Sequence, residues 1–90
     1  MEVKIVVKEI TSPGCQHCAH AKKYFEEIFK PKHPNVEIQY IDVTTLEGQE
    51  LVQKHMIFAS PGIIINDELF STGGLDVKKF EAKIAELESK

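Results

Sequence analysis

The sequence Thr11-Ser12-Pro13-Gly14-Cys15-Gln16-His17-Cys18 decides the fold of this chain, because it holds both of its cysteines. Cys15 and Cys18 are three residues apart, and a disulfide that closes so short a loop constrains the unfolded chain very little. A small secreted scaffold would normally carry four or more cysteines. A single Cys-x-x-Cys pair therefore indicates either redox chemistry or a metal site.

Length and charge exclude several other classes of protein. The 90 residues suffice for one compact domain, which we expect to span residues 1–90. The net charge is −3 and all 11 basic residues are lysines, whereas recognition of nucleic-acid phosphates favours a basic, arginine-rich surface. No apolar run approaches the roughly 18 residues of a membrane helix, and the N-terminus has no signal-peptide pattern. We therefore expect a cytoplasmic protein that binds neither nucleic acid nor membrane.

Apolar runs and breaking residues divide the chain into seven elements. A mostly apolar run at residues 2–10 predicts a strand that is buried on both faces. Apolar residues at helical spacing then extend from Cys15 to about Lys30-Pro31, where proline removes a backbone donor. The remaining elements are strands at 36–41, 63–65 and 68–72, a helix capped by Thr44 or Thr45, and a helix capped by Asp76. The order is β-α-β-α-β-β-α, with the first two strands parallel and the last two joined as a hairpin by Asn66-Asp67.

Each predicted helix has an apolar face that should pack against the sheet. Gly48 weakens the first turn of the second helix by about 1 kcal/mol relative to alanine. Leu75 and Phe80 occupy the positions of a hydrophobic staple at the start of the last helix. The residues expected to face inward are Cys18, Ala21, Phe25, Ile28 and Phe29 in the first helix, Leu51, Val52 and Met56 in the second, and Val77, Phe80, Ile84 and Leu87 in the last.

The start of a helix gives the two cysteines different chemistry. Cys15 falls at the helix N-terminus, where free backbone N–H groups and the helix dipole stabilise a thiolate. Its pKa should fall from about 8.5 toward or below 7, so that it attacks a substrate disulfide at neutral pH. Cys18 lies on the apolar face one turn further, so it should be buried. The pair predicts a thiol–disulfide oxidoreductase in which Cys18 releases the reduced product from a mixed disulfide on Cys15.

His17 precedes the second cysteine and is a candidate for tuning the pair. As an imidazolium it would stabilise the Cys15 thiolate, which stabilises the reduced form and raises the reduction potential. Known pairs at helix N-termini range from about −270 to −120 mV, and this hypothesis places the present pair in the middle. The alternative interpretation is an exposed residue without effect on the thiols. Lys22 and Lys23, one turn past Cys18, are interpreted as a solvated helix face.

Three features together resemble the thioredoxin and glutaredoxin superfamily: the cysteine motif after a strand, Ser60-Pro61 before another strand, and Gly73-Gly74 before the last helix. The resemblance covers essentially the whole chain. It implies an α/β, thioredoxin-like fold with a four-stranded mixed sheet flanked by three helices. It also implies that Pro61 is cis and faces the disulfide, and that the backbone of Ser60 binds the substrate chain. The alternative for Pro61 is a trans proline in a loop.

The chain departs from thioredoxins around the motif. Gly14 replaces the tryptophan that thioredoxins carry before the first cysteine, and Gln16-His17 replaces their usual Gly-Pro. A histidine before the second cysteine is similar to protein disulfide isomerases. We count Gly14 and Gln16, which flank Cys15, among the substrate-binding residues.

An acidic residue is a further point of resemblance. Thioredoxins bury one six positions before the first cysteine, where it accepts a proton from the second. Glu9 stands at that offset in an apolar strand, so the resemblance implies a raised pKa and proton exchange with Cys18. The alternative is a carboxylate at the end of the strand that faces water.

Glutathione is one of two electron donors that the resemblance implies. Gly73-Gly74-Leu75-Asp76 resembles the Gly-Gly element with which glutaredoxins bind glutathione, although strand termination and helix capping explain the same residues. Ser60 replaces the valine of the glutaredoxin Val-Pro pair, and the chain has no arginine. The other donor is a thioredoxin-reductase-like flavoprotein, and the substrates are proteins that carry disulfides. We expect a monomer without a bound cofactor, because the Cys15–Cys18 pair itself carries the electrons.

Two other interpretations of the motif remain open. The first is a copper- or zinc-binding module, because Cys15, His17, Cys18 and His20 offer soft ligands, although no second cysteine pair exists to complete a closed zinc site. The second is a non-catalytic interaction domain on the same fold, for which the loss of one cysteine is the usual sign.

Overall fold

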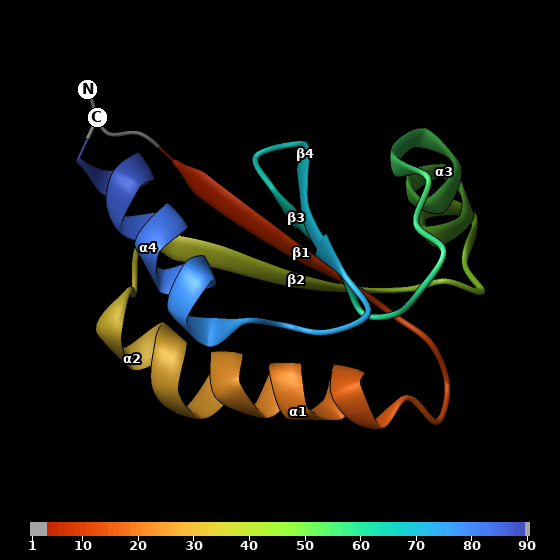
Figure 1. Cartoon of the computed structure of the whole chain (residues 1–90), viewed down its shortest axis with the longest axis horizontal. Helices are drawn as coiled ribbons and strands as arrows, with labels where there is room; N and C mark the ends of the chain where they lie inside the picture. Colours follow the sequence, from red (N-terminus) through yellow and green to blue (C-terminus); the bar gives the residue numbers. More distant parts are fainter. Residues whose placement is uncertain (1–3, 90) are drawn as a thin grey trace.

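The sheet has the strand order β2-β1-β3-β4 in the computed structural model, which describes residues 4–89. The strands are β1 (Ile5–Thr11), β2 (Val36–Asp42), β3 (Gly62–Ile65) and β4 (Glu68–Thr72). β1 pairs in parallel with β2, whereas the pairs of β1 with β3 and of β3 with β4 are antiparallel. The mixed sheet and the hairpin are therefore confirmed (Figure 1). The first two residues of the predicted first strand lie outside the described residues.

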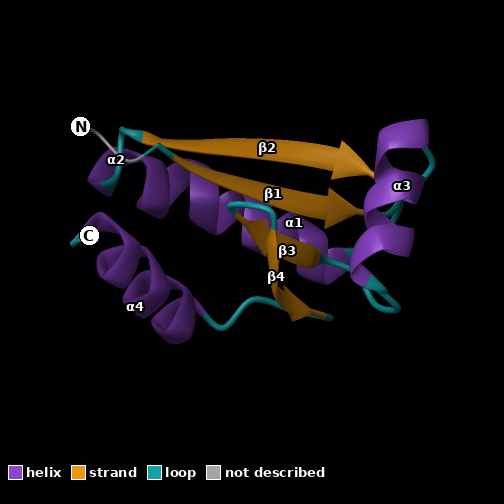
Figure 2. Ribbon diagram, turned by 90° about the horizontal axis from the view of Figure 1, so that it is seen from above, coloured by secondary structure: helices purple, strands orange, loops and turns teal. Residues whose placement is uncertain are grey.

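Helices cover both faces of this sheet. They are α1 (Gln16–Tyr24), α3 (Leu46–His55) and α4 (Val77–Glu88), and α1 continues through the π-helical segment η1 (Phe25–Phe29) into α2 (Lys30–Lys32). Ile63 and Ile65 of β3 pack with α1, η1 and α4, whereas Ile64 between them packs with α3, so α3 lies on the opposite face. Figure 2 shows α3 at the carboxyl ends of β1 and β2. The α/β thioredoxin-like fold is confirmed.

An aromatic cluster forms the larger part of the core. Phe25, Phe29 and Phe80 are completely buried, and the ring of Phe80 lies 5.3 Å and 5.0 Å from those of Phe25 and Phe29 in T-shaped contacts. These contacts fix α1 and α4 against each other and against the sheet. A smaller cluster beneath α3 consists of Ile10, Ile41, Ile57 and Ile64, with Val43, Leu51 and Val52 packed against it.

Side-chain caps begin α3 and α4 where the sequence predicts them. The Thr45 hydroxyl accepts a hydrogen bond from the Gly48 N–H at 3.0 Å, and the Asp76 carboxylate accepts one from the Lys79 N–H at 3.1 Å. Gly48 has a second role, because a Cβ at this position would overlap the backbone oxygen of Asp42 at the end of β2. The missing side chain lets α3 approach the sheet closely.

The first helix differs from the prediction. Helical conformation ends at Lys32, close to the predicted end at Lys30-Pro31, but the helix is not uniform. The N–H of Lys30 bonds to the carbonyl of Phe25, five residues back, which widens the turn. This wider turn brings Phe29 over the core and leaves Ile28 49% exposed, so the inward orientation predicted for Ile28 is wrong.

Three further expectations about burial are wrong. Met56 is 67% exposed, because it takes the left-handed conformation that ends α3 and turns away from the core. Val77 is 38% exposed at the first position of α4, beside the exposed His17 and His20. β1 is buried on one face but only half-buried at Val6 and Lys8, since α3 covers just the far end of the other face. None of the helices within residues 4–89 is long and apolar enough to cross a membrane.

Candidate functional site

The two cysteines form a disulfide at the start of α1. Cys15 is the N-cap, and its Sγ accepts a hydrogen bond from the Cys18 N–H at 3.0 Å. The two Cα atoms lie 5.2 Å apart, and Cys18 is only 4% exposed whereas Cys15 is half-exposed. Gly14 precedes the helix with a φ of +75°, in the left-handed region that glycine tolerates best. The sequence thus places one accessible and one buried sulfur at the positive end of a helix.

The loop that enters β3 faces this disulfide. The Ser60–Pro61 peptide bond is cis, as the resemblance implied, and the Ser60 hydroxyl lies 3.7 Å from the Sγ of Cys15. The same hydroxyl bonds to that of Ser12 at 2.8 Å, which ties the loop to the segment before the helix. The Gly73 N–H donates to the carbonyl of Pro61 at 3.0 Å, so the end of β4 also lies against this loop.

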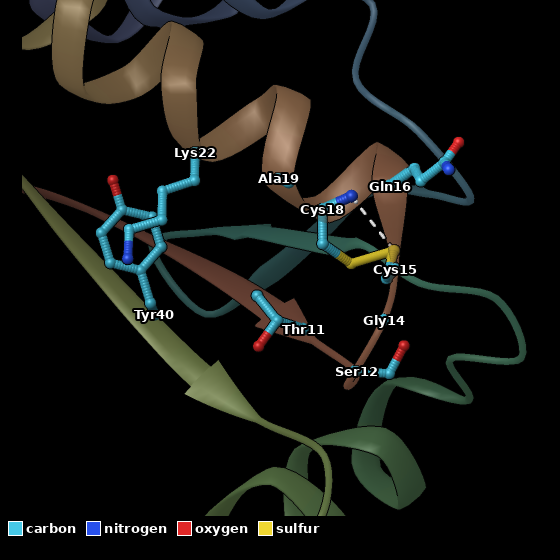
Figure 3. Close-up of a pocket in the computed structure, with 9 residues that line it drawn as sticks. All are labelled: Thr11, Ser12, Gly14, Cys15, Gln16, Cys18, Ala19, Lys22 and Tyr40. Carbon is cyan, nitrogen blue, oxygen red and sulfur yellow. Dashed lines mark hydrogen bonds between the residues drawn. A yellow bond between two sulfur atoms is a disulfide. The ribbon is translucent and has the colours of Figure 1, made fainter.

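A pocket of about 470 Å³ opens beside the disulfide (Figure 3). Cys15 and Cys18 form one side of it, with Gly14 and Gln16 next to them. Lys22 and Tyr40 line its far side, and Thr11, Ser12 and Ala19 complete the lining. Two residues of the predicted substrate-binding set therefore lie in the pocket with the sulfurs.

Glu9 is completely buried in β1, and neither of its carboxylate oxygens has a hydrogen-bond partner among the described residues. Val7, Glu9 and Thr11 alternate on one face of the strand. Val7 packs beneath α1 and η1, whereas Thr11 lines the pocket with the disulfide, so Glu9 lies between the core and the site. Burial raises the pKa of Glu9 from 4.5 to about 7, and the positive charge of Lys22 partly opposes that rise.

Lys22 and Tyr40 line the pocket although neither is predicted from the sequence to belong to the site. Tyr40 is the direct neighbour of Glu9 across the parallel β1–β2 pair, so both side chains point to the α1 face. The ammonium group of Lys22 lies 5.0 Å from the centre of the Tyr40 ring, within cation–π range. The register between β1 and β2 brings these side chains together, and sequence spacing gives no sign of it.

Other predicted site residues lie away from the pocket. His17 is exposed and makes an edge contact with His20 at 6.5 Å between ring centres, in a separate hollow beside α4. Gly73 and Gly74 line another hollow at the end of β4, although Gly73 contacts the Pro61 loop. Within residues 4–89, no three histidine, cysteine or carboxylate side chains gather in an arrangement that could hold a metal ion.

The mixed sheet, the disulfide at the first turn of α1 and the cis proline beside it define a thioredoxin-fold protein. Residues 1–86 match the Thioredoxin domain family. The thioredoxin of Methanocaldococcus jannaschii is 35% identical over 66 residues, which are 73% of this chain and 75% of that protein. The chain belongs to the thioredoxin family.

Solved structures agree on the fold. A thioredoxin-like protein from Clostridium perfringens superposes with a TM-score of 0.79 at 15% identity, covering 100% of this chain and 75% of that one. A chain of the complex between ferredoxin:thioredoxin reductase and thioredoxin f2 superposes with a TM-score of 0.70 at 20% identity, covering 94% and 78%. The family and the disulfide support thiol–disulfide oxidoreductase chemistry.

Proposed function

We propose that this protein is a thiol–disulfide oxidoreductase that reduces or exchanges disulfides of other proteins. The observation that carries the proposal is the asymmetric disulfide, with a half-exposed Cys15 at the helix N-terminus and a buried Cys18 one turn inside. In the reduced protein, the helix terminus stabilises the Cys15 thiolate, which attacks a substrate disulfide and forms a mixed disulfide. Cys18 then attacks the Sγ of Cys15, and the substrate leaves as a thiol.

Glu9 is the proposed proton acceptor for Cys18. It lies between the core and the pocket and has a pKa near neutrality, at which a carboxyl group both accepts and returns a proton. Both of its oxygens are free of hydrogen bonds within the described part of the chain, so they can take that proton. His17 stays in the proposal only as an influence on the reduction potential, because it lies outside the pocket.

The surface around the disulfide is the proposed substrate site. Ser60 and Pro61 face Cys15, and the backbone of Ser60 would pair with an extended substrate segment. Gly14 and Gln16 would contact the same segment from the helix side. Gly73 would contribute through its bond to Pro61, with Gly74 beside it.

The electron donor belongs to the same proposal. Either a thioredoxin-reductase-like flavoprotein or glutathione would return the Cys15–Cys18 disulfide to the dithiol, with no bound cofactor. The second donor requires the Gly73-Gly74 hollow to bind a carboxylate. We place this chemistry in a monomer in the cytoplasm, where such reductants keep thiols reduced.

An insulin-reduction assay with dithiothreitol tests the proposal. The protein should accelerate precipitation of the insulin B chain over the dithiothreitol blank, and Cys15→Ser should abolish the acceleration. A protein that binds clients without turnover would give no acceleration, which would refute the oxidoreductase proposal. Tight one-to-one binding of zinc by the reduced protein would favour the metal-binding alternative instead.

A further inference from the structure

A lysine lies over the aromatic residue next to the buried carboxyl group of the site. Lys22 follows Cys18 by four residues, so the two side chains share one face of α1. Both line the pocket, and Figure 3 shows the Lys22 side chain extending along the ring of Tyr40. Tyr40 in turn is the cross-strand neighbour of Glu9. The charge of Lys22 is therefore held on the pocket side of Glu9.

A hydrogen bond to Glu26 holds the Tyr40 ring over which this lysine lies. The Tyr40 hydroxyl donates to the carboxylate of Glu26, which also forms an ion pair with Lys30 at 2.7 Å. Lys22 lies over the aromatic face of Tyr40, 5.0 Å from the ring centre. No ion pair is seen for Lys22 within residues 4–89.

We propose that Lys22 is a positioning residue that acts on Glu9, keeping a fraction of this buried carboxyl group ionised so that it can take the proton of Cys18. This inference rests on the proposed oxidoreductase function. Without a nearby cation, a carboxylate that has no hydrogen bond and no exposure would stay protonated well above neutral pH. Such a group could not act as a base when Cys18 must lose its proton.

The groups that face Glu9 are few. On α1 they are Lys22 and Cys18, on β2 the neighbour is Tyr40, and on β3 the neighbour is the apolar Ile63. Glu26 of η1 lies beyond the Tyr40 hydroxyl. Lys30 of α2 also lies 6.0 Å from the centre of the Tyr40 ring, but it is ion-paired with Glu26, and among the described residues it is the charge of Lys22 that lowers the pKa of Glu9.

The step can be written so that protons and electrons balance. In a mixed disulfide on Cys15, the Cys18 thiol gives its proton to the Glu9 carboxylate. The Cys18 sulfur bonds to the Sγ of Cys15, and the bond from Cys15 to the substrate sulfur breaks. The substrate sulfur leaves with the electron pair and takes a proton from water. The protein dithiol loses two electrons overall, and the substrate disulfide gains them.

The first test titrates Glu9 itself in the oxidised protein, by the carbon NMR signal of its carboxyl group. Lys22→Met should raise the proton affinity of Glu9 about three- to tenfold, because it removes the nearby positive charge. Lys22→Arg keeps the charge and should restore the titration toward that of the parent protein. Lys23→Met is the matched control, since Lys23 is also exposed on α1 but does not line the pocket, and it should leave the titration unchanged. A titration that is the same in Lys22→Met and the parent protein would overturn the inference.

The second test follows the resolving step in a single turnover with dithiodipyridine, a disulfide without charge at neutral pH. Release of the second thiopyridone reports the attack of Cys18. Lys22→Met should slow this phase about three- to tenfold at neutral pH, with the difference shrinking in alkaline buffer as Glu9 ionises. An equal slowing at every pH would show a structural defect and contradict the proposal. The titration needs no turnover, so failure in the insulin assay alone would count against the oxidoreductase function and not against the action of Lys22 on Glu9.

Discussion

Glu9→Gln should make the oxidised protein more stable, and the gain should depend on pH. The carboxyl group has a pKa of 4.5 when exposed and of about 7 in the folded protein, so the folded state binds its proton more tightly than the unfolded state. The difference between the two values, at about 1.4 kcal/mol for each pH unit, amounts to about 3 kcal/mol. Stability from this group is fully present below pH 4.5 and is lost as the pH rises through about 7.

A glutamine resembles the protonated carboxyl group in size and polarity but cannot ionise. The variant and the parent protein should therefore have similar free energies of unfolding in acid, and the variant should be about 3 kcal/mol more stable in mildly alkaline buffer. Urea unfolding of the oxidised proteins, followed by circular dichroism across this pH range, measures the difference. Glu50→Gln, an exposed residue of α3, serves as the control. If Glu9→Gln and the parent protein lost stability in parallel with rising pH, Glu9 would not be a buried, uncompensated carboxyl group.

Three further variants probe the cysteines, the histidine and the approach of α3. Cys18→Ser should leave a substrate protein attached to Cys15 as a stable mixed disulfide, seen as added mass without reductant; failure to trap any substrate would contradict the two-step exchange. His17→Gln should make the disulfide more reducing by about 5–20 mV against glutathione in mildly acidic buffer, where histidine is cationic; an unchanged potential would remove the tuning hypothesis. Gly48→Ala should lower the free energy of unfolding by about 1–3 kcal/mol in urea, despite the better helix propensity of alanine. Gly74→Ala is the control, because a Cβ there has open space, and it should cause no such loss. If Gly48→Ala were as stable as the parent protein, α3 would be able to shift without cost.

Local signals predicted most of the fold. Thr45 and Asp76 cap their helices because a short polar side chain can accept a bond only from the first turn that follows it. Asn66 and Asp67 both adopt a positive φ in the hairpin turn, which these residues tolerate better than others. Signals of this kind depend on a few neighbouring residues, so sequence alone identifies them.

Features that depend on packing could not be predicted in the same way. The π-helical turn at Phe25–Phe29 changes which side chain faces the core, whereas local periodicity assumes a uniform helix and so predicts that Ile28 faces inward. From propensity alone Gly48 is a weak point in its helix, but its missing side chain allows close contact with the end of β2. In both cases a packing contact decides the outcome, and helical periodicity alone does not report it.

The residues of the candidate site also fall into two groups: those that a local motif or the family resemblance indicates, and those that only the packing of the strands reveals. The two cysteines and the cis proline follow from a short motif and a family resemblance. The same resemblance implies a buried Glu9, but the sequence leaves open a carboxylate that faces water, and the structure decides between the two by placing Glu9 on the face of β1 that carries Ile5 and Val7. From sequence alone Lys22 belongs to a solvated helix face. Its place in the site becomes clear only from the β1–β2 register, which sets Tyr40, the residue under Lys22, beside Glu9.

The same arrangement explains why an exposed lysine can matter to a buried acid. Surface charges usually have little effect, since water screens them. Here the ammonium group lies over the ring of Tyr40, the neighbour of the buried Glu9, and a protein interior screens a charge less than water does. The acid therefore remains buried, which raises its pKa, while the lysine keeps that pKa close enough to neutrality for the group to change its charge during the reaction. A fully solvated acid would be a weaker base toward Cys18, and an isolated buried acid would already hold its proton.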